Sequence, residues 1–501
     1  MEFINKVQEA LLPVVVDING YMSDYILFFL LVGIGIFYTI RTRFVQVRCF
    51  GEGMKKVFGN LSLRGGKQKG GLSSFQALAT AIAAQVGTGN IVGACGAILI
   101  GGPGAIFWMW IIAFFGMATI YSEAVLAQQT KEVQADGSVL GGPVYYIKKA
   151  FNNTFGKILA VFFAIAITLA LGFMGAMVQS NSIASSVSTA TKGFVAPWVV
   201  GLILAAICAF IFIGGIQRIA SVAEKIVPVM AVVYLAIGLI ILCINIKYVP
   251  ATFGMIFKYA FVPHALLGGA VGAAIKAAIS QGVKRGLFSN EAGMGSTPHA
   301  HAQAKVKTPH EQGVVAMIGV FIDTFVVLTI TALVVISTLY AGNGPLADAP
   351  ERIAAGENFL DIVASFGLNK ANLMQTAVGE AFGSPLAGSI IVAVCLTFFA
   401  FTTIISWNFF GKQNVQYLFK KKGSNVAVIV YSVVAVAFIF LGSLFENDLV
   451  WELTDMFNNL MVIPNVLALA FLSKYVVDET KAASKRRKEL KAQKAAEKAD
   501  K

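Results

Sequence analysis

Charged residues are scarce in this chain. Of its 501 residues, 13% are charged and 57% are hydrophobic, whereas soluble domains carry about 25% charged residues. This composition excludes an ordinary soluble domain and predicts a polytopic membrane protein. The N-terminal stretch has no basic region followed by an apolar core and a small-residue cleavage site, so we expect no cleaved signal peptide.

Cysteine and histidine are also rare. The five cysteines stand singly and form no CxxC pair, which argues against a disulfide framework or a thiolate metal site. His299, His301 and His310 fall in an expected cytoplasmic loop without a metal-ligand spacing. Because no expected span joins a nucleophile to a base, we predict no catalytic residues, no enzyme activity and no organic cofactor.

Long hydrophobic runs, in contrast, are abundant. Eleven of them approach or exceed the length of about 20 residues that crosses a bilayer, although Lys276, Lys284 and Arg285 interrupt the seventh. The predicted fold class is therefore all-α, with about eleven transmembrane helices. The runs lie near residues 24–41, 73–99, 105–130, 158–186, 196–215, 222–245, 264–292, 313–341, 385–411, 425–443 and 449–473.

The positive charge of the chain is best explained by membrane topology. A net charge of +13 would suggest nucleic acid in a soluble protein. If the N-terminus lies outside, however, 30 of the 39 Lys and Arg residues lie on the cytoplasmic side and six lie outside. We therefore predict a multi-pass plasma-membrane protein with a cytoplasmic C-terminus that contacts lipid and binds no nucleic acid.

The spans fall into two halves of opposite orientation. After residues 1–72, which hold the first span and a basic cytoplasmic loop, five spans occupy 73–245 and five occupy 246–473. An odd number of spans per half makes the second half inverted. The segment 342–384 is expected to form an outer cap, and 474–501 a basic cytoplasmic tail. AIAAQVGTGN at 81–90 echoes AAISQGVKRG at 277–286, and paired discontinuous helices of this kind point to a transport site at the midplane.

The first of these helices is interrupted at Val86-Gly87-Thr88-Gly89-Asn90. Backbone groups freed inside a membrane need protein or a watery cavity to satisfy them. The carbonyl groups from Ala83 to Val86 suit Na⁺ or an ammonium group, and the N–H groups after the break suit a carboxylate. Gln85 and Asn90 add side-chain oxygens. The alternative is a helix whose small residues simply allow close packing.

The second interrupted stretch is richer in polar groups. Gln281 and Gly282 are candidate site residues there. Within this stretch, residues 280–291, the charged residues Lys284, Arg285 and Glu291 must face a cavity or each other, because charge within a membrane is costly. Their alternative is to lie near the cytoplasmic end of the span and reach toward water.

Oxygen ligands and a lone acid occur in two later spans. Hydroxyl groups of Thr402, Thr403 and Ser406 facing the first break would complete an oxygen cage for Na⁺, although such residues also bond back to their own helix. Asp323 is the only acid of its span and a candidate coupling group, with a paired structural role as the alternative. Phe173 and Trp407 could form an apolar wall that limits side-chain size, or could be ordinary packing residues.

Two motifs carry a resemblance to a known family. QVGTGNIVGA (85–94) and GLFSNEAGMGSTPHAHA (286–302) resemble those of the alanine or glycine:cation symporter family, over nearly the whole chain. That family is similar to sodium-coupled transporters with the leucine-transporter fold. The resemblance implies that 86–90 binds the substrate carboxylate, that Asn90 lies near a substrate-adjacent sodium, and that Ala83, Val86, Thr402 and Thr403 form a second sodium site. It also implies substrate-pocket roles for Gln85, Gly87, Thr88, Gly89, Phe173, Gln281, Gly282 and Trp407.

The predicted function is Na⁺-coupled import of small neutral amino acids, alanine and glycine first, by alternating access. A glutamine-specific or H⁺-coupled symporter is the alternative within transport. An ion channel is disfavoured because VGTG occurs once, whereas a carbonyl filter needs four copies. The oligomeric state stays open, with a monomer as one expectation.

Overall fold

The computed structural model describes residues 2–59, 72–135, 137–213, 215–262, 271–342, 344–355, 357, 359–419, 424–445 and 447–499. Almost all of its regular structure is helical. The helices up to residue 190 are α1 (Glu2–Tyr21), α2 (Phe28–Arg41), α3 (Val45–Arg48), α4 (Phe50–Phe58), α5 (Ser74–Gln85), α6 (Ala94–Gly101), α7 (Ala105–Thr130), α8 (Pro143–Ala150), α9 (Thr154–Ile167) and α10 (Ala176–Ala190).

The helices that follow are α11 (Pro197–Ile213), α12 (Gly215–Ile244), α13 (Val249–Tyr259), α14 (Val271–Asn290), α15 (Pro298–Ala302), α16 (Pro309–Val320), α17 (Thr329–Val335), α18 (Ala349–Ala354), α19 (Phe359–Ser365), α20 (Leu373–Phe382), α21 (Pro385–Leu418), α22 (Ser424–Gly442), α23 (Asn447–Phe471) and α24 (Ser473–Ala499). Two short strands, β1 (Glu132–Val133) and β2 (Val139–Leu140), pair antiparallel.

Several spans contain π-helical segments, in which one extra residue is accommodated in a turn. They are η1 (Met22–Leu27), η2 (Gly89–Gly93), η3 (Thr168–Gly175), η6 (Phe321–Leu328) and η7 (Ile336–Tyr340), and a short 3₁₀ segment, η4 (Ile246–Tyr248), precedes α13. Such insertions occur frequently at functional sites. Here η2 carries Asn90 and η6 carries Asp323.

The all-α membrane architecture predicted from the sequence is confirmed, but the count of eleven spans is not. Within the described residues, eight helical stretches are long and apolar enough to cross a membrane, and the bent pair Ser74–Gln85 and Gly89–Gly101 makes a ninth. The other two predicted spans correspond to α11, which has 17 residues, and to α14, which contains the charged residues noted above. Residues 264–270 of the seventh predicted span lie outside the described residues.

The first helix of the bundle core is broken where the sequence predicts. Ser73 and Gln76 form a capping box at the start of α5, each side chain accepting a hydrogen bond from the other's backbone N–H. The helix ends at Gln85, and Val86 leaves the helical region with φ −79° and ψ 87°. The two halves of the broken pair are bent by 46°.

The second break lies later than the sequence suggests. The matching stretch predicted at 280–291 is helical over most of its length, because α14 continues to Asn290. The chain turns after it, with positive φ angles at Glu291, Gly293 and Gly295, and α15 begins at Pro298. The turn therefore falls in the middle of the 286–302 motif.

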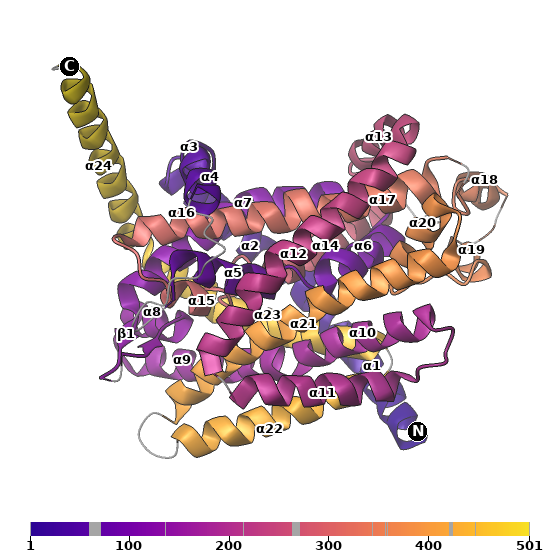
Figure 1. The fold of residues 1–501 in the computed structure, drawn as a ribbon, viewed down its shortest axis with the longest axis horizontal. Helices are drawn as coiled ribbons and strands as arrows, with labels where there is room; N and C mark the ends of the chain where they lie inside the picture. Colours follow the sequence, from indigo (N-terminus) through magenta and orange to yellow (C-terminus); the bar gives the residue numbers. More distant parts are fainter. Residues whose placement is uncertain are drawn as a thin grey trace.

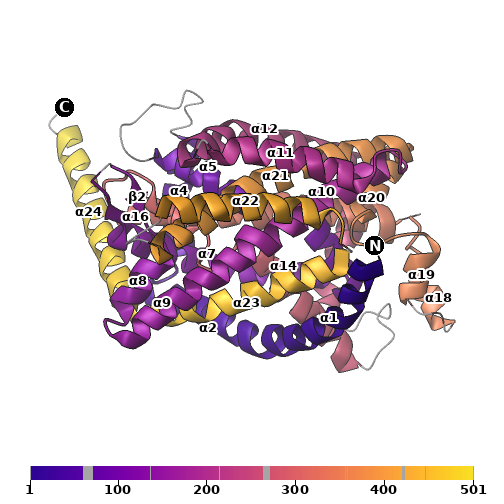
Figure 2. The same cartoon turned by 90° about the horizontal axis from the view of Figure 1, so that it is seen from below.

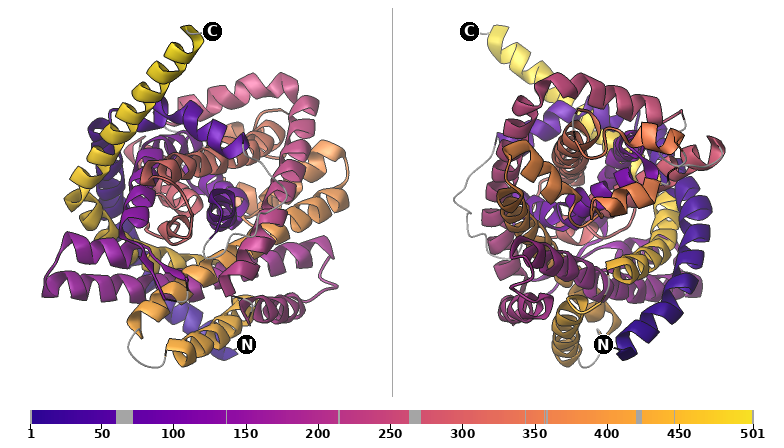
Figure 3. Two further views of the ribbon diagram at one scale, coloured as in Figure 1. Left: turned by 60° about the vertical axis from the view of Figure 1, so that its left-hand side comes forward. Right: turned by 90° about the vertical axis from the view of Figure 1, so that its right-hand side faces the viewer.

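The elements expected on opposite sides of the membrane gather at opposite ends of the molecule. In Figures 1 and 2, α4, α8 and α24 lie toward one end, and the N-terminus, α18 and α19 lie toward the other. The helix α24 projects away from the bundle in both views of Figure 3. Both helix breaks lie between these ends, within the packed interior.

Candidate functional site

A buried carboxylate joins the first break to the end of α14. Asp323 Oδ1 accepts hydrogen bonds from Asn90 Nδ2 at 2.7 Å and from Ser289 Oγ at 3.0 Å. Its Oδ2 accepts from Ser289 at 2.9 Å and from Thr324 Oγ1 at 2.8 Å. All four side chains are fully buried. The lone acid predicted as a site residue therefore connects η2, η6 and α14.

Carbonyl and hydroxyl oxygens meet at the end of α5. Thr403 Oγ1 lies 2.9 Å from the carbonyl oxygen of Ala83 and 3.5 Å from that of Val86. This is the arrangement predicted for the oxygen cage. The adjacent Thr402 does not join it. Both hydroxyls lie 3.0 Å from the Phe399 carbonyl, but the second contact of Thr402 is the sulfur of Met230 on α12 at 3.7 Å, away from α5. Residues next to each other on a helix point about 100° apart, so only one of the pair can face α5.

A glutamine on α10 caps the turn between the two halves of the first broken helix. Gln179 Oε1 accepts a hydrogen bond from the Thr88 N–H at 3.1 Å, and Asn90 Oδ1 accepts one from the Gly87 N–H at 3.0 Å. Gln85 Nε2 donates to the Asn290 carbonyl at 2.8 Å. A Cβ atom at Gly87 would lie 2.5 Å from Thr403 Oγ1, so glycine is needed for this close approach.

Some buried polar atoms at this break have no hydrogen-bond partner within the described residues. They are Gln85 Oε1, Thr88 Oγ1, Gln179 Nε2 and Ser406 Oγ. Such atoms are rare in native structures and call for an explanation. A bound polar solute or cation would supply the missing partners, so the donor and acceptor set fits the ligands predicted from the sequence.

Two further carboxylates hold the second break. Glu123 of α7 accepts hydrogen bonds from the Gly293 and Gly295 N–H groups at 3.1 and 3.0 Å, and from Asn465 Nδ2. Glu291 accepts from Trp407 Nε1 at 2.5 Å, and Ser296 also donates to it. The predicted wall residue Trp407 is thereby fixed at the second break, with its ring in edge contact with Phe288.

No described contact brings three of the predicted pocket residues, Phe173, Gln281 and Gly282, to the first break. Phe173 packs its ring against Tyr431 and Phe438 of α22. A Cβ at Gly282 would lie 2.5 Å from Trp108 Cβ, so this glycine serves the close packing of α14 on α7. Gln281, half-buried one residue earlier, has an unpartnered Oε1 among the described residues, but no described contact brings it to the first break.

Sequence reasoning left two acids out of the site. Glu123 is as isolated in its apolar span as Asp323 is in its own, so the criterion that selected Asp323 would have found it. Glu291 was noted only as one of several polar residues of the second stretch. Its role depends on the turn after Asn290, which the sequence did not locate.

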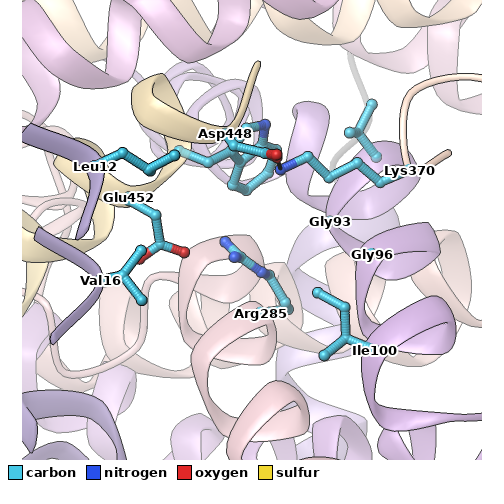
Figure 4. A pocket seen from close by; sticks show the side chains of 11 residues that line it. Leu12, Val16, Gly93, Gly96, Ile100, Arg285, Lys370, Asp448 and Glu452 are labelled. Carbon is cyan, nitrogen blue, oxygen red and sulfur yellow. Dashed lines mark ion pairs between the residues drawn. The ribbon is translucent and has the colours of Figure 1, made fainter. Parts of the chain in front are cut away.

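A pocket of about 260 Å³ opens toward the end that holds the N-terminus, between α1, α6, α14 and α23. Figure 4 shows Arg285 and Glu452 pointing into it, with Lys370 and Asp448 side by side. Lys370 Nζ lies 2.7 Å from Asp448 Oδ1. The pocket reaches Val92 and Gly93 of η2, so it leads from the surface toward the first break.

Arg285 lines this pocket, and it shares the acid Asp455 of α23 with its neighbour Lys284. Asp455 Oδ2 lies 3.1 Å from Lys284 Nζ and 3.0 Å from Arg285 Nη1, and Lys284 also contacts Glu452 at 3.3 Å. Both basic side chains are at most 10% exposed. Both basic side chains therefore pair with acids of α23, and Arg285 also lines the pocket, which agrees with the predicted alternative of facing a cavity.

The fold, with its two broken helices, matches a known class of membrane-protein structure. The structure is similar to a crystal structure of MhsT in complex with L-phenylalanine, with a TM-score of 0.57 and 14% identity over 83% of this chain and 93% of that one. This likeness shows that the chain has the leucine-transporter fold. The family follows from the sequence: residues 8–498 match the model of the sodium:alanine symporter family, and the chain belongs to that family.

Two relatives show how closely the chain follows the family. It is 41% identical to the sodium/alanine symporter AgcS of Methanococcus maripaludis, over 94% of this chain and 97% of AgcS. It is 36% identical to the "probable sodium/glutamine symporter GlnT" of Bacillus subtilis, over 96% of this chain and 92% of GlnT. The similarity extends over the whole bundle in both cases.

Proposed function

We propose that this protein imports small neutral amino acids, alanine and glycine first, by Na⁺ symport. The observation that carries the proposal is the position of the Thr403 hydroxyl, within 3.5 Å of the carbonyl oxygens of Ala83 and Val86 at a helix break. Na⁺ is a hard cation that takes oxygen ligands, and broken membrane helices hold such ions with their unwound carbonyls. Na⁺ is cargo in this mechanism, and no organic cofactor is needed.

The substrate is proposed to bind at residues 86–90. In the structure, the side chains of Asn90 and Gln179 occupy the N–H groups of Gly87 and Thr88. A substrate carboxylate would take over these donors, since the start of a helix favours negative charge. A second Na⁺ beside Asn90 would be balanced by Asp323, whose carboxylate lies 2.7 Å from the Asn90 amide.

The pocket is proposed to admit only small side chains. Trp407 is 1% exposed and is held by its hydrogen bond to Glu291. A Cβ atom at Gly175 would lie 2.5 Å from its ring. This rigid wall supports alanine or glycine over a larger substrate. Glutamine remains the second candidate, because GlnT is described as a sodium/glutamine symporter.

Alternating access is proposed to involve the two halves 73–245 and 246–473, with the N-terminus outside and the C-terminus in the cytosol. Binding of Na⁺ and of substrate at elements from both halves would couple the two equilibria reciprocally. The chain would work in the plasma membrane. All residues proposed for the site belong to one chain, which supports a monomer as the working unit.

The test is uptake of radiolabelled alanine into proteoliposomes under an inward Na⁺ gradient, compared with choline and with a pH gradient alone. We expect saturable uptake that requires Na⁺ and is competed by glycine. Uptake driven by the pH gradient alone would replace Na⁺ with H⁺ and make Asp323 the first candidate for proton coupling. Uptake of glutamine but not alanine would overturn the substrate assignment and leave the coupling intact.

A further inference from the structure

A second group of potential metal ligands lies outside the transport site, at the end of the molecule that carries α4 and α24. Cys49, Glu52 and His310 offer a sulfur, a carboxylate oxygen and an imidazole nitrogen that all lie within 4.8 Å of one another. They come from two segments far apart in the sequence. Cys49 directly precedes α4, Glu52 lies in the first turn of α4, and His310 lies at the start of α16.

Close helix packing brings these segments together. A Cβ atom at Gly53 would lie 2.6 Å from the Val314 carbonyl oxygen, so the glycine lets α4 lie directly on α16. Cys49 is buried, and His310 is 5% exposed. The side chain of Glu52 is 27% exposed, which leaves a route from water to the group.

The hydrogen bonds of His310 fix which nitrogen faces the group. Nδ1 lies 2.7 Å from the Tyr121 hydroxyl, which lies 3.1 Å from Thr480 Oγ1. Thr480 in turn donates its proton to the Val476 carbonyl. Each hydroxyl has one proton, so Tyr121 donates to Thr480 and His310 Nδ1–H donates to Tyr121. Hydrogen bonding of the second ring nitrogen in this way is typical of metal-binding histidines.

His310 Nε2 then faces the carboxylate of Glu52 at 3.4 Å. Two acceptor atoms at this distance need a proton or a cation between them. In a tetrahedral Zn²⁺ site, with metal–ligand distances of about 2.0–2.2 Å, neighbouring nitrogen and oxygen ligands lie about 3.4 Å apart. The observed separation already matches that edge of a zinc site.

We propose that Cys49, Glu52 and His310 bind a Zn²⁺-like divalent cation, with water as the fourth ligand. A thiolate, an imidazole and a carboxylate together suit borderline-soft Zn²⁺ better than Na⁺ or Mg²⁺. Burial raises the pKa of the Cys49 thiol, so metal binding must release its proton.

The site joins α4 to the helix that leads directly into η6 and Asp323. A metal bound there would restrict movement of α16 relative to α4. We therefore expect Zn²⁺ to slow transport without competing with Na⁺ or substrate. Zn²⁺ binding is measured without transport, so the metal site is tested independently of the proposed transport function.

The experiment uses the purified full-length protein, stripped of metal with a chelator and titrated with Zn²⁺ against a chromophoric competitor. Co²⁺ is used in parallel as a spectroscopic probe. We expect one equivalent per chain, a tetrahedral Co²⁺ spectrum and a thiolate-to-Co²⁺ charge-transfer band. Cys49→Ser should remove that band, and Glu52→Gln and His310→Gln should weaken binding at least tenfold.

Cys243→Ser is the matched control, because Cys243 is an exposed cysteine distant in sequence from both segments, and it should bind Zn²⁺ like the unaltered chain. If His310→Gln fails to fold, Glu52→Gln tests the site instead, because the Glu52 side chain is partly exposed. Binding that none of the three substitutions weakens, or a Co²⁺ spectrum without a thiolate band, would overturn the proposal. No stoichiometric binding at all would show that a protonated His310–Glu52 ion pair alone explains the geometry.

Discussion

Gly87 is the residue whose substitution should most directly disturb the proposed sodium site. A Cβ atom there would lie 2.5 Å from Thr403 Oγ1 and 3.2 Å from Gln179 Oε1. Overpacking of a tight interior costs about 1–3 kcal/mol, which corresponds to about a 5- to 150-fold change in affinity. We expect Gly87→Ala to lower apparent Na⁺ affinity in this range, as measured from the Na⁺ dependence of uptake.

Gly33→Ala is the control for this substitution. Gly33 lies within α2, and a Cβ atom there would meet nothing within 4 Å. It should leave the Na⁺ dependence unchanged. An unaltered Na⁺ affinity in Gly87→Ala, with the protein correctly inserted, would remove the first break from the sodium site.

The candidate site was partly predictable at the level of single residues. Alternate glycines inside an apolar run indicate a break, and a lone acid such as Asp323 indicates a functional position. The choice between Thr402 and Thr403 was not predictable, because it depends on how α21 is rotated against α5. The contacts of Phe173 were not predictable either, because an aromatic residue in an apolar span can face any neighbouring helix.

At the scale of the helices, buried ion pairs join α14 to α23. Lys284 and Arg285 both contact Asp455, whose side chain is 4% exposed. Removal of one partner leaves buried charge uncompensated, at a cost of about 3–5 kcal/mol. We expect Asp455→Asn to lower the thermal unfolding temperature of the detergent-solubilised protein by several degrees.

The control for this substitution is Glu357→Gln, which removes the exposed partner of Arg352. Exposed ion pairs contribute little to stability, so its unfolding temperature should not change measurably. If the two variants unfold alike, the contacts of Asp455 do not hold α14 to α23.

The two helix breaks differ in how far the sequence could locate them. Val86–Asn90 holds two glycines in a short polar stretch, and the break follows from helix propensity. Gly282 and Gly286 gave a similar pattern, yet Gly282 faces α7 and serves close packing. The actual second break depends on positive φ angles at Glu291, Gly293 and Gly295, and its N–H groups are satisfied by Glu123, which is distant in sequence.

For the whole molecule, the proposed topology places α19 outside and the segment before α16 in the cytosol. Ala364 and Lys307 are exposed at these two places. In a cysteine-free background, we expect Ala364→Cys to react with an impermeant maleimide in intact cells. Lys307→Cys should react only after permeabilisation. The reverse pattern would invert the proposed orientation.

The class of the whole molecule was the most predictable feature. Hydropathy identifies the spanning segments. In lipid, backbone N–H and C=O groups must be hydrogen-bonded within the segment itself, so an apolar run of this length forms a helix. The number of spans is harder to define, because α11 is short and α14 carries buried charges that only its pairing with α23 explains. Both runs were found from the sequence, but their apolar composition does not decide whether they count as full spans.

The central claim is that Na⁺ binds between Thr403 and the end of α5, and two adjacent substitutions test it. Thr403→Val and Thr402→Val each remove one hydroxyl with little change in volume, but only the first hydroxyl lies by Ala83 and Val86. The measurement is the Na⁺ concentration that gives half-maximal alanine uptake. We predict an increase of at least about tenfold, or about 1.4 kcal/mol, for Thr403→Val and little change for Thr402→Val. Equal effects, or a larger effect of Thr402→Val, would contradict the account.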